Sequence, residues 1–183
     1  MIARLTAFLL VAAIVTGCGD GRSDDNPFAP GIAPRGDAVD GLVVGHRLMR
    51  AGEYELAIDA FSRGALQHGV TGEVLIGLGS AHLALGRLGQ AEDLLRDAID
   101  VDERAPEAWN NLGVVLMEKG ETPEAAQMFR RAYAIDNGES DSIRDNLRLA
   151  LAKMENPVYD PVQKQDYKLV QRGSSDYLIR KIP

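Results

Sequence analysis

Apolar residues recur at spacings of three and four through the middle of the chain, which is the pattern of amphipathic helices. One apolar stripe contains Leu75, Leu78 and Gly79, and a later one contains Ala91 and Leu95. Each unit of the pattern predicts two helices that are joined by a short turn. Runs of β-branched and aromatic residues are scarce. The pattern therefore disfavours an all-β sandwich.

The pattern of small and large residues repeats every 34 positions. Small residues at matching positions let two paired helices approach closely, and a glycine after each first helix suits a left-handed C-cap. Because one helix pair cannot bury its own apolar face, we expect the copies to stack as a solenoid. The columns are Gly45, Gly79 and Gly113; Gly52, Gly86 and Gly120; Ala57, Ala91 and Ala125; Phe61, Leu95 and Phe129; and Gly64, Ala98 and Ala132.

The third copy resembles the tetratricopeptide repeat. Where that family has Trp, Leu, Gly, Tyr, Gly, Ala, Phe and Ala, this chain has Trp109, Leu112, Gly113, Leu116, Gly120, Ala125, Phe129 and Ala132. The chain departs from the family pattern at Gly41, in place of Trp, and at His82, in place of Tyr. The resemblance implies an all-α, right-handed solenoid of three helix-turn-helix repeats. These repeats are expected at residues 38–71, 72–105 and 106–139.

Two further segments follow the repeats. Residues 140–154 place Ile143, Leu147 and Ala150 on one stripe, which predicts a capping helix that completes a domain over 38–154. Residues 155–183 contain prolines and three tyrosines, and are expected to form either a disordered tail or a short hairpin. Their apolar residues favour an internal plug in the groove of the first two copies, or alternatively a mobile binding arm.

The first segment has the features of a secretion signal. Residues 1–17 contain Arg4 and then a mostly apolar stretch that is too short to span a bilayer, with a buried helix as the alternative. The sequence Val-Thr-Gly-Cys that ends at Cys18 resembles the lipobox of bacterial lipoproteins. That resemblance implies cleavage before Cys18 and acylation of this residue. Residues 18–37 are rich in Gly, Pro and Asp and predict a flexible tether.

Charge and residue chemistry exclude several functions. The chain has 27 acidic and 20 basic residues, a net charge of −7, and therefore lacks the positive charge that nucleic-acid binding requires. Its single cysteine cannot form an internal disulfide, and its three histidines do not have metal-ligand spacing. His82 is expected to be a packing residue. We expect no catalytic residue, cofactor, metal or small-molecule substrate, and hence no enzyme.

In the tetratricopeptide family, the first helix of each pair lines a concave groove, and its outward residues select the ligand. The resemblance implies a protein-binding groove here that is apolar at its start and polar later. Such a surface suits an amphipathic helix or an extended apolar segment. The expected groove residues are Leu42, Val43, His46, Met49, Arg50, Glu73, Ile76, Ser80, Leu83, Glu107, Asn110, Asn111, Val114, Met117 and Glu118, with Arg144, Asp145 and Arg148 from the capping helix.

Together these features predict a membrane-anchored adaptor that binds protein or peptide partners in the bacterial envelope. Its build resembles that of lipoproteins from pilus and secretion systems, in particular the tight-adherence pilus assembly lipoproteins. The alternative is a scaffold or regulator of envelope enzymes such as peptidoglycan hydrolases. The lipid on Cys18 would hold the domain in the periplasm. Gly19 stands where Asp would retain a lipoprotein in the inner membrane, which favours the outer membrane.

Overall fold

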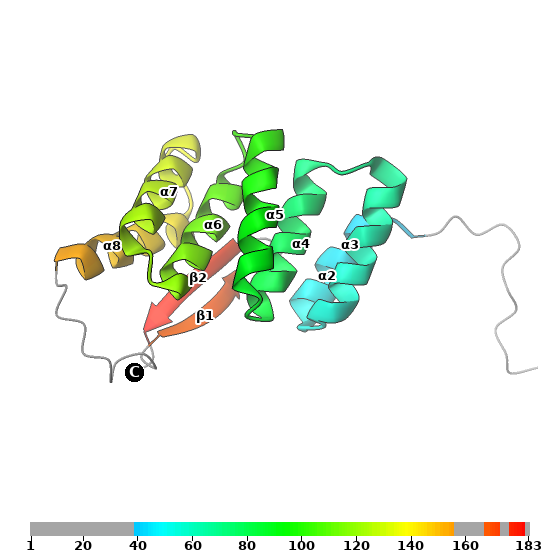
Figure 1. Cartoon of the computed structure of the whole chain (residues 1–183), viewed down its shortest axis with the longest axis horizontal. Helices are drawn as coiled ribbons and strands as arrows, with labels where there is room; N and C mark the ends of the chain where they lie inside the picture. The colour runs from blue at the N-terminus through cyan, green and yellow to red at the C-terminus, as the bar shows by residue number, and fades with distance from the viewer. Residues whose placement is uncertain (1–38, 156–166, 173–175, 182–183) are drawn as a thin grey trace, which may run out of the picture. The chain divides into compact units, whose positions relative to one another are not determined.

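The computed structural model describes residues 39–155, 167–172 and 176–181, which form seven helices and two strands (Figure 1). The expected signal peptide, Cys18 and the tether lie outside the described residues. The helices come as three pairs and a seventh helix: α2 (Gly41–Ala51) and α3 (Tyr54–His68), α4 (Gly72–Ala84) and α5 (Leu88–Val101), α6 (Pro106–Lys119) and α7 (Thr122–Ile135), and α8 (Asp141–Glu155). The strands are β1 (Tyr167–Arg172) and β2 (Asp176–Lys181).

Local sequence signals set the helix ends. The side chain of Asp40 accepts a hydrogen bond of 2.8 Å from the backbone N–H of Leu42, and Thr71 caps α4 with its hydroxyl oxygen. Gly52 and Gly120 end the first helices of their pairs with φ of 79° and 85°, a conformation that strongly favours glycine. In all three pairs the second helix begins two residues after the glycine that recurs every 34 positions (Gly52, Gly86 and Gly120), as the repeat pattern predicts.

The two helices of a pair touch where the sequence places a glycine opposite a large side chain. A Cβ atom added at Gly113 would lie 2.6 Å from the ring of Phe129, and one added at Gly45 would lie 2.5 Å from the ring of Phe61. Both phenylalanines are fully buried. The close helix pairing and the all-α solenoid of three repeats expected from the sequence are therefore confirmed.

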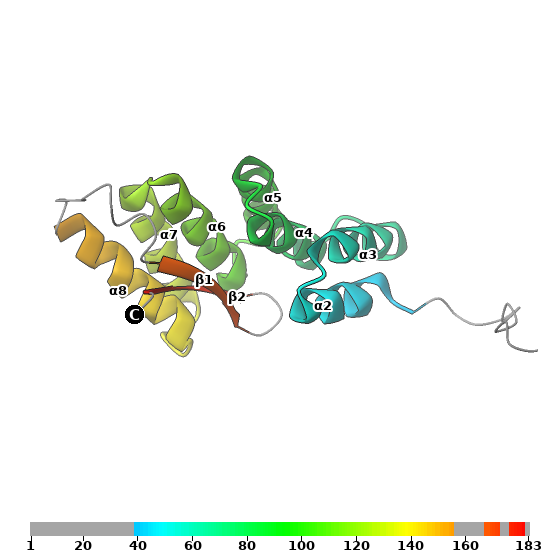
Figure 2. The same cartoon turned by 90° about the horizontal axis from the view of Figure 1, so that it is seen from below.

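The last helix and the two strands complete the described part of the chain. Helix α8 packs on α7 and buries Ile143 and Ala150, as expected of the capping helix. Strands β1 and β2 pair antiparallel, with Val170 opposite Leu178, so the structure has the hairpin alternative for these residues. Figure 2 shows the hairpin beside α6 and α8, and β2 contacts both helices.

Candidate functional site

Strand β2 lies in the polar part of the expected groove. The side chains around it are Asn110 and Asn111 of α6, Asn146 of α8 and Ser80 of α4, and each of these residues is fully buried. We call the three amides the asparagine cluster (Asn110, Asn111 and Asn146). The residues expected to contact a ligand thus already contact a polypeptide strand, which belongs to the same chain.

The asparagine cluster holds the backbone of β2. Asn146 donates from Nδ2 to the carbonyl oxygen of Tyr177 at 2.7 Å and accepts at Oδ1 from the N–H of Ile179 at 3.0 Å. Asn110 donates to the same Tyr177 carbonyl at 3.2 Å. One side-chain amide therefore pairs with two backbone groups of the strand, as a peptide group of a neighbouring strand would.

The cluster is also joined internally. Asn146 donates to Oδ1 of Asn110 at 3.0 Å, and Asn110 donates to Oδ1 of Asn111 at 3.1 Å. Asn111 in turn donates to the hydroxyl oxygen of Ser80 at 3.0 Å. Because a buried polar group without a partner costs free energy, this chain of bonds fixes the orientation of each amide. The groove thus presents a fixed donor and a fixed acceptor to an extended backbone.

The side chain of Tyr177 reaches from β2 to the second repeat. Its hydroxyl donates to the carbonyl oxygen of Ser80 at 3.0 Å, and only 2% of the residue is exposed. Burial raises the pKa of this hydroxyl, with a smaller contribution from Tyr54, so it remains a neutral donor over the physiological range. Tyr177 therefore connects the hairpin to α4 of the second repeat.

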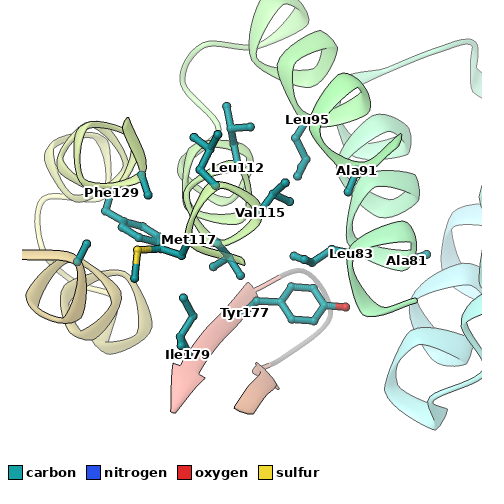
Figure 3. Packing of buried hydrophobic residues seen from close by; sticks show 14 of the residues in the cluster. Ala81, Leu83, Ala91, Leu95, Leu112, Val115, Met117, Phe129, Tyr177 and Ile179 are labelled. Atoms are coloured by element: carbon teal, nitrogen blue, oxygen red, sulfur yellow. The ribbon is translucent and has the colours of Figure 1, made fainter. Parts of the chain in front are cut away.

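Apolar side chains pack beneath the strand (Figure 3). The Tyr177 ring points toward Leu83 of α4, and Ile179 points toward Met117 of α6. All four residues belong to the main hydrophobic cluster, which continues through Val114. Tyr177 and Ile179 are two residues apart in a strand and therefore face the same side. The groove binds the strand through its backbone and through one of its two faces.

The start of the groove is not covered by the hairpin. A cavity of about 320 Å³ opens there, between the first turns of α4 and α6. His46 Nε2 lies 3.1 Å from a carboxylate oxygen of Glu73 at this place. The cavity is lined by His46, Gly72, Glu73, Ile76, Asp102, Ala105 and Glu107. Four of the expected groove residues on first helices, His46, Glu73, Ile76 and Glu107, therefore border an open space that has three carboxylates in its lining.

The remaining expected groove residues are spread over surface and core. Val43, Arg50 and Glu118 are exposed, Leu42 is half-buried, and Met49 is buried in the main cluster. In α8, Arg144 forms an ion pair with Asp141, and Arg148 lies 3.6 Å from Asp145. These two arginines bind carboxylates of their own helix.

The position of the hairpin corrects one expectation. Docking was expected on the first two copies, against Leu42, Val43, Met49, Ile76 and Leu83. Strand β2 instead contacts mainly α6 of the third repeat and α8, and it reaches the second repeat through Tyr177, which lies near Leu83. The reason is polar pairing: the backbone of β2 finds its donors and acceptor in the asparagine cluster, and an apolar surface offers none.

Asn146 was missing from the expected site, while Tyr177 and Ile179 were expected only as apolar residues of the docking tail. A signal for Asn146 was present, because it follows Ile143 by three residues and precedes Ala150 by four, inside the buried stripe of α8. An asparagine in such a stripe indicates a buried amide with a partner. The sequence does not indicate that this partner is a strand 31 residues away.

The described residues contain few other candidates for chemistry. His82 is half-buried, its Nδ1 atom has no hydrogen-bond partner, and burial lowers its pKa, which agrees with a neutral packing residue. Within 39–155 and the two strands, no three His, Cys, Asp or Glu side chains are grouped as a metal site would require. In the same residues, no helix combines the length and apolar character needed to cross a membrane.

Comparison with known proteins agrees with the repeat architecture. A family model described as tetratricopeptide repeat matches residues 44–100 and 76–140. Tetratricopeptide repeat protein 7B of Mus musculus, and that of Homo sapiens, are each 42% identical to this chain over 52 residues. That match covers 28% of this chain and only 6% of the relative.

Solved structures show the same fold at low sequence identity. The Sgt2 TPR domain from Aspergillus fumigatus superposes with a TM-score of 0.61 at 23% identity, over 64% of this chain and 78% of that one. The second TPR domain of human RPAP3, in complex with an HSP70 peptide, gives a TM-score of 0.56 at 23% identity, over 62% and 94% of the two chains. These similarities extend to the fold and not to the ligand.

Proposed function

We propose that this chain, which belongs to the tetratricopeptide repeat family, is a lipid-anchored adaptor that binds partner polypeptides in the assembly of an envelope machine. The family's fold is generally a scaffold for protein binding, because stacked helix pairs create an extended concave surface. The observation that carries the proposal is the asparagine cluster, which already holds an extended strand by its backbone. A groove with this chemistry is suited to bind polypeptide.

The first residues of the sequence support a proposed place of action. Val15-Thr16-Gly17-Cys18 follows an apolar stretch of signal-peptide length. Each buried methylene of a lipid contributes about 0.8 kcal/mol, so two or three acyl chains on Cys18 would hold the domain at a membrane. The resemblance to pilus and secretion lipoproteins supports a tight-adherence or related pilus as the machine, with the outer membrane as the favoured location.

Site-specific photo-crosslinking in bacterial cells tests the adaptor role. A photoreactive residue is placed at Glu73, which borders the open cavity, and in a second strain at Leu66 of α3, which is 89% exposed and away from the cavity. We expect a covalent partner from Glu73 and not from Leu66, and we expect this partner to be a subunit of a pilus or secretion assembly. A peptidoglycan hydrolase as the partner would favour the alternative scaffold, and equal crosslinking from both positions would contradict binding by the groove.

Mass spectrometry of the mature N-terminus tests the anchor. We expect a chain that begins with an acylated Cys18, and we expect Cys18→Ser to release the protein from membranes. A mature chain with unmodified Cys18, or membrane association that survives the substitution, would contradict lipid anchoring while leaving the groove's role open to the crosslinking test.

A further inference from the structure

We propose that the asparagine cluster and the adjacent apolar surface are a binding site for an extended segment of a partner protein, in which a tyrosine is followed two residues later by an aliphatic side chain. Strand β2 occupies this site as an internal competitor, and the partner segment displaces it. This proposal rests on the adaptor function proposed above and names the chemical class of its partner.

The backbone contacts do not depend on the identity of the bound sequence. Asn146 contacts the Tyr177 carbonyl and the Ile179 N–H, and Asn110 contacts the same carbonyl. Every extended polypeptide carries these two backbone groups at the same spacing. The asparagine cluster can therefore hold a strand of another protein in the register in which it holds β2.

Selectivity comes from two side chains of the strand. Tyr177 is 2% exposed and its hydroxyl donates to the Ser80 carbonyl, so this position requires an aromatic ring with a donor at its tip. Ile179 is 6% exposed and belongs to the same cluster as Met117, so this position requires an apolar side chain. The site therefore recognises a tyrosine and an aliphatic residue separated by one residue.

The groove beneath β2 contains more polar side chains than are needed simply to cover the helices. Ser80 and the asparagine cluster are fully buried, and each buried polar group costs free energy unless it is hydrogen-bonded. Apolar side chains would cover the helices without that cost. Amides in these orientations are instead what the recognition of a backbone requires, since they supply the missing partners of an extended segment.

The hairpin is covalently joined to the helices only through a stretch of sequence. Eleven residues, 156–166, separate the end of α8 from the start of β1. The helices pack on their own neighbours along the solenoid, and a two-stranded hairpin is marginally stable by itself. Because β2 is covalently linked, its local concentration at the site is on the order of millimolar. A partner can bind only the molecules in which β2 has left the site, so its apparent affinity equals the intrinsic affinity multiplied by the fraction of such molecules.

Fluorescence anisotropy with a labelled peptide tests the exchange directly. The probe is a synthetic copy of residues 172–181, RGSSDYLIRK, added to the full chain and to the full-length variant Tyr177→Ala. We expect the peptide to bind Tyr177→Ala at least about tenfold more tightly than the unchanged protein, because the weakened internal strand leaves the site free more often. A control peptide with Ala in place of Tyr should bind at least about tenfold more weakly to the same variant.

A second substitution locates the bound peptide. Adding Asn146→Ala to Tyr177→Ala should abolish binding of the probe, whereas adding Glu155→Ala, at an exposed position of the same helix and outside the expected groove, should leave it unchanged. Circular dichroism confirms that each variant keeps its helices. If Tyr177→Ala loses them, Ile179→Ala replaces it with the same expected gain in affinity.

Three results of these binding measurements would contradict the proposed site. Equal affinity of the probe for the unchanged protein and the hairpin variant, or no binding to a variant with intact helices, would overturn the proposal. So would equal binding of the control peptide. These outcomes are independent of the adaptor role, which is tested by the crosslinking at Glu73 and Leu66.

Discussion

The hydroxyl of Tyr177 donates a hydrogen bond of 3.0 Å to the carbonyl oxygen of Ser80, a residue 97 positions earlier in the chain. This contact joins the C-terminal hairpin to the second repeat, while the asparagine cluster joins it to the third repeat and the capping helix. Strand β2 thus lies across the polar part of the expected groove and contacts residues of the second repeat, the third repeat and the capping helix.

Alkaline pH should weaken the docking of Tyr177. Its pKa is raised in the folded protein above the ordinary value of 10.0, mainly by burial. The stabilisation is therefore fully present below pH 10 and is lost as the pH rises above 10, because the free hairpin releases the proton more readily. Thermal melts from pH 8 to 11 should show this loss in the unchanged protein, and a smaller loss in Tyr177→Phe.

At neutral pH, Tyr177→Phe should have a modest effect. It removes the hydrogen bond to Ser80 and leaves the packing of the ring in place, so we expect a loss of about 0.5–1.5 kcal/mol in the free energy of docking. If the stability of Tyr177→Phe fell between pH 8 and 11 as much as that of the unchanged protein, Tyr177 would not be buried against the second repeat.

Asn146→Ala should destabilise the hairpin more than Tyr177→Phe does. The substitution leaves the N–H of Ile179 without its acceptor in a buried place, and the cost of such a group is about 1–3 kcal/mol. Denaturant unfolding monitored over the whole chain measures the loss, and Arg148→Ala at an exposed position of the same helix is the control. Equal stability of Asn146→Ala and Arg148→Ala would contradict the contact between α8 and β2.

The packing of the repeats predicts opposite outcomes for two glycine substitutions. Gly113→Ala would place Cβ 2.6 Å from the Phe129 ring and should cost about 1–3 kcal/mol. Gly89→Ala in α5 meets no atom within 4 Å and should be neutral or stabilise by about 0.4–1 kcal/mol, since alanine lowers the entropy of the unfolded chain. Thermal melts that rank the two variants in the reverse order would contradict the pairing of α6 with α7.

Glu92 should make the junction of the second and third repeats sensitive to acid. Its carboxylate lies 2.6 Å from Nζ of Lys119, and this hydrogen bond, together with one from Arg96, lowers its pKa below the ordinary 4.5. The stabilisation is present above pH 4.5 and is lost as the pH falls below it. We expect Glu92→Gln to lower the stability by about 1 kcal/mol at pH 7 and to reduce the acid dependence, with the exposed Asp93→Asn as the control.

The repeat architecture could be predicted because its signals are local and periodic. Gly113 and Phe129 recur at 34-residue steps with their counterparts, so the helix pairs and their close approach follow from spacing alone. The docking of β2 depends instead on single pairings between distant residues, such as Asn146 with Tyr177. No periodic pattern carries such a pairing. The apolar residues of the tail indicated that it would dock, but the amides that select the place of docking lie among apolar positions of α6 and α8.

Hydrogen–deuterium exchange of the amides in residues 176–181 tests most directly whether β2 occupies the groove. In the full chain we expect the Ile179 amide, which donates to Asn146, to exchange at least about tenfold more slowly than in the isolated peptide. In Asn146→Ala this protection should be lost, while the amides of α6 should remain protected. Exchange of residues 176–181 at the rate of the isolated peptide, with the helices protected, would show that the strand is free and that the groove is open.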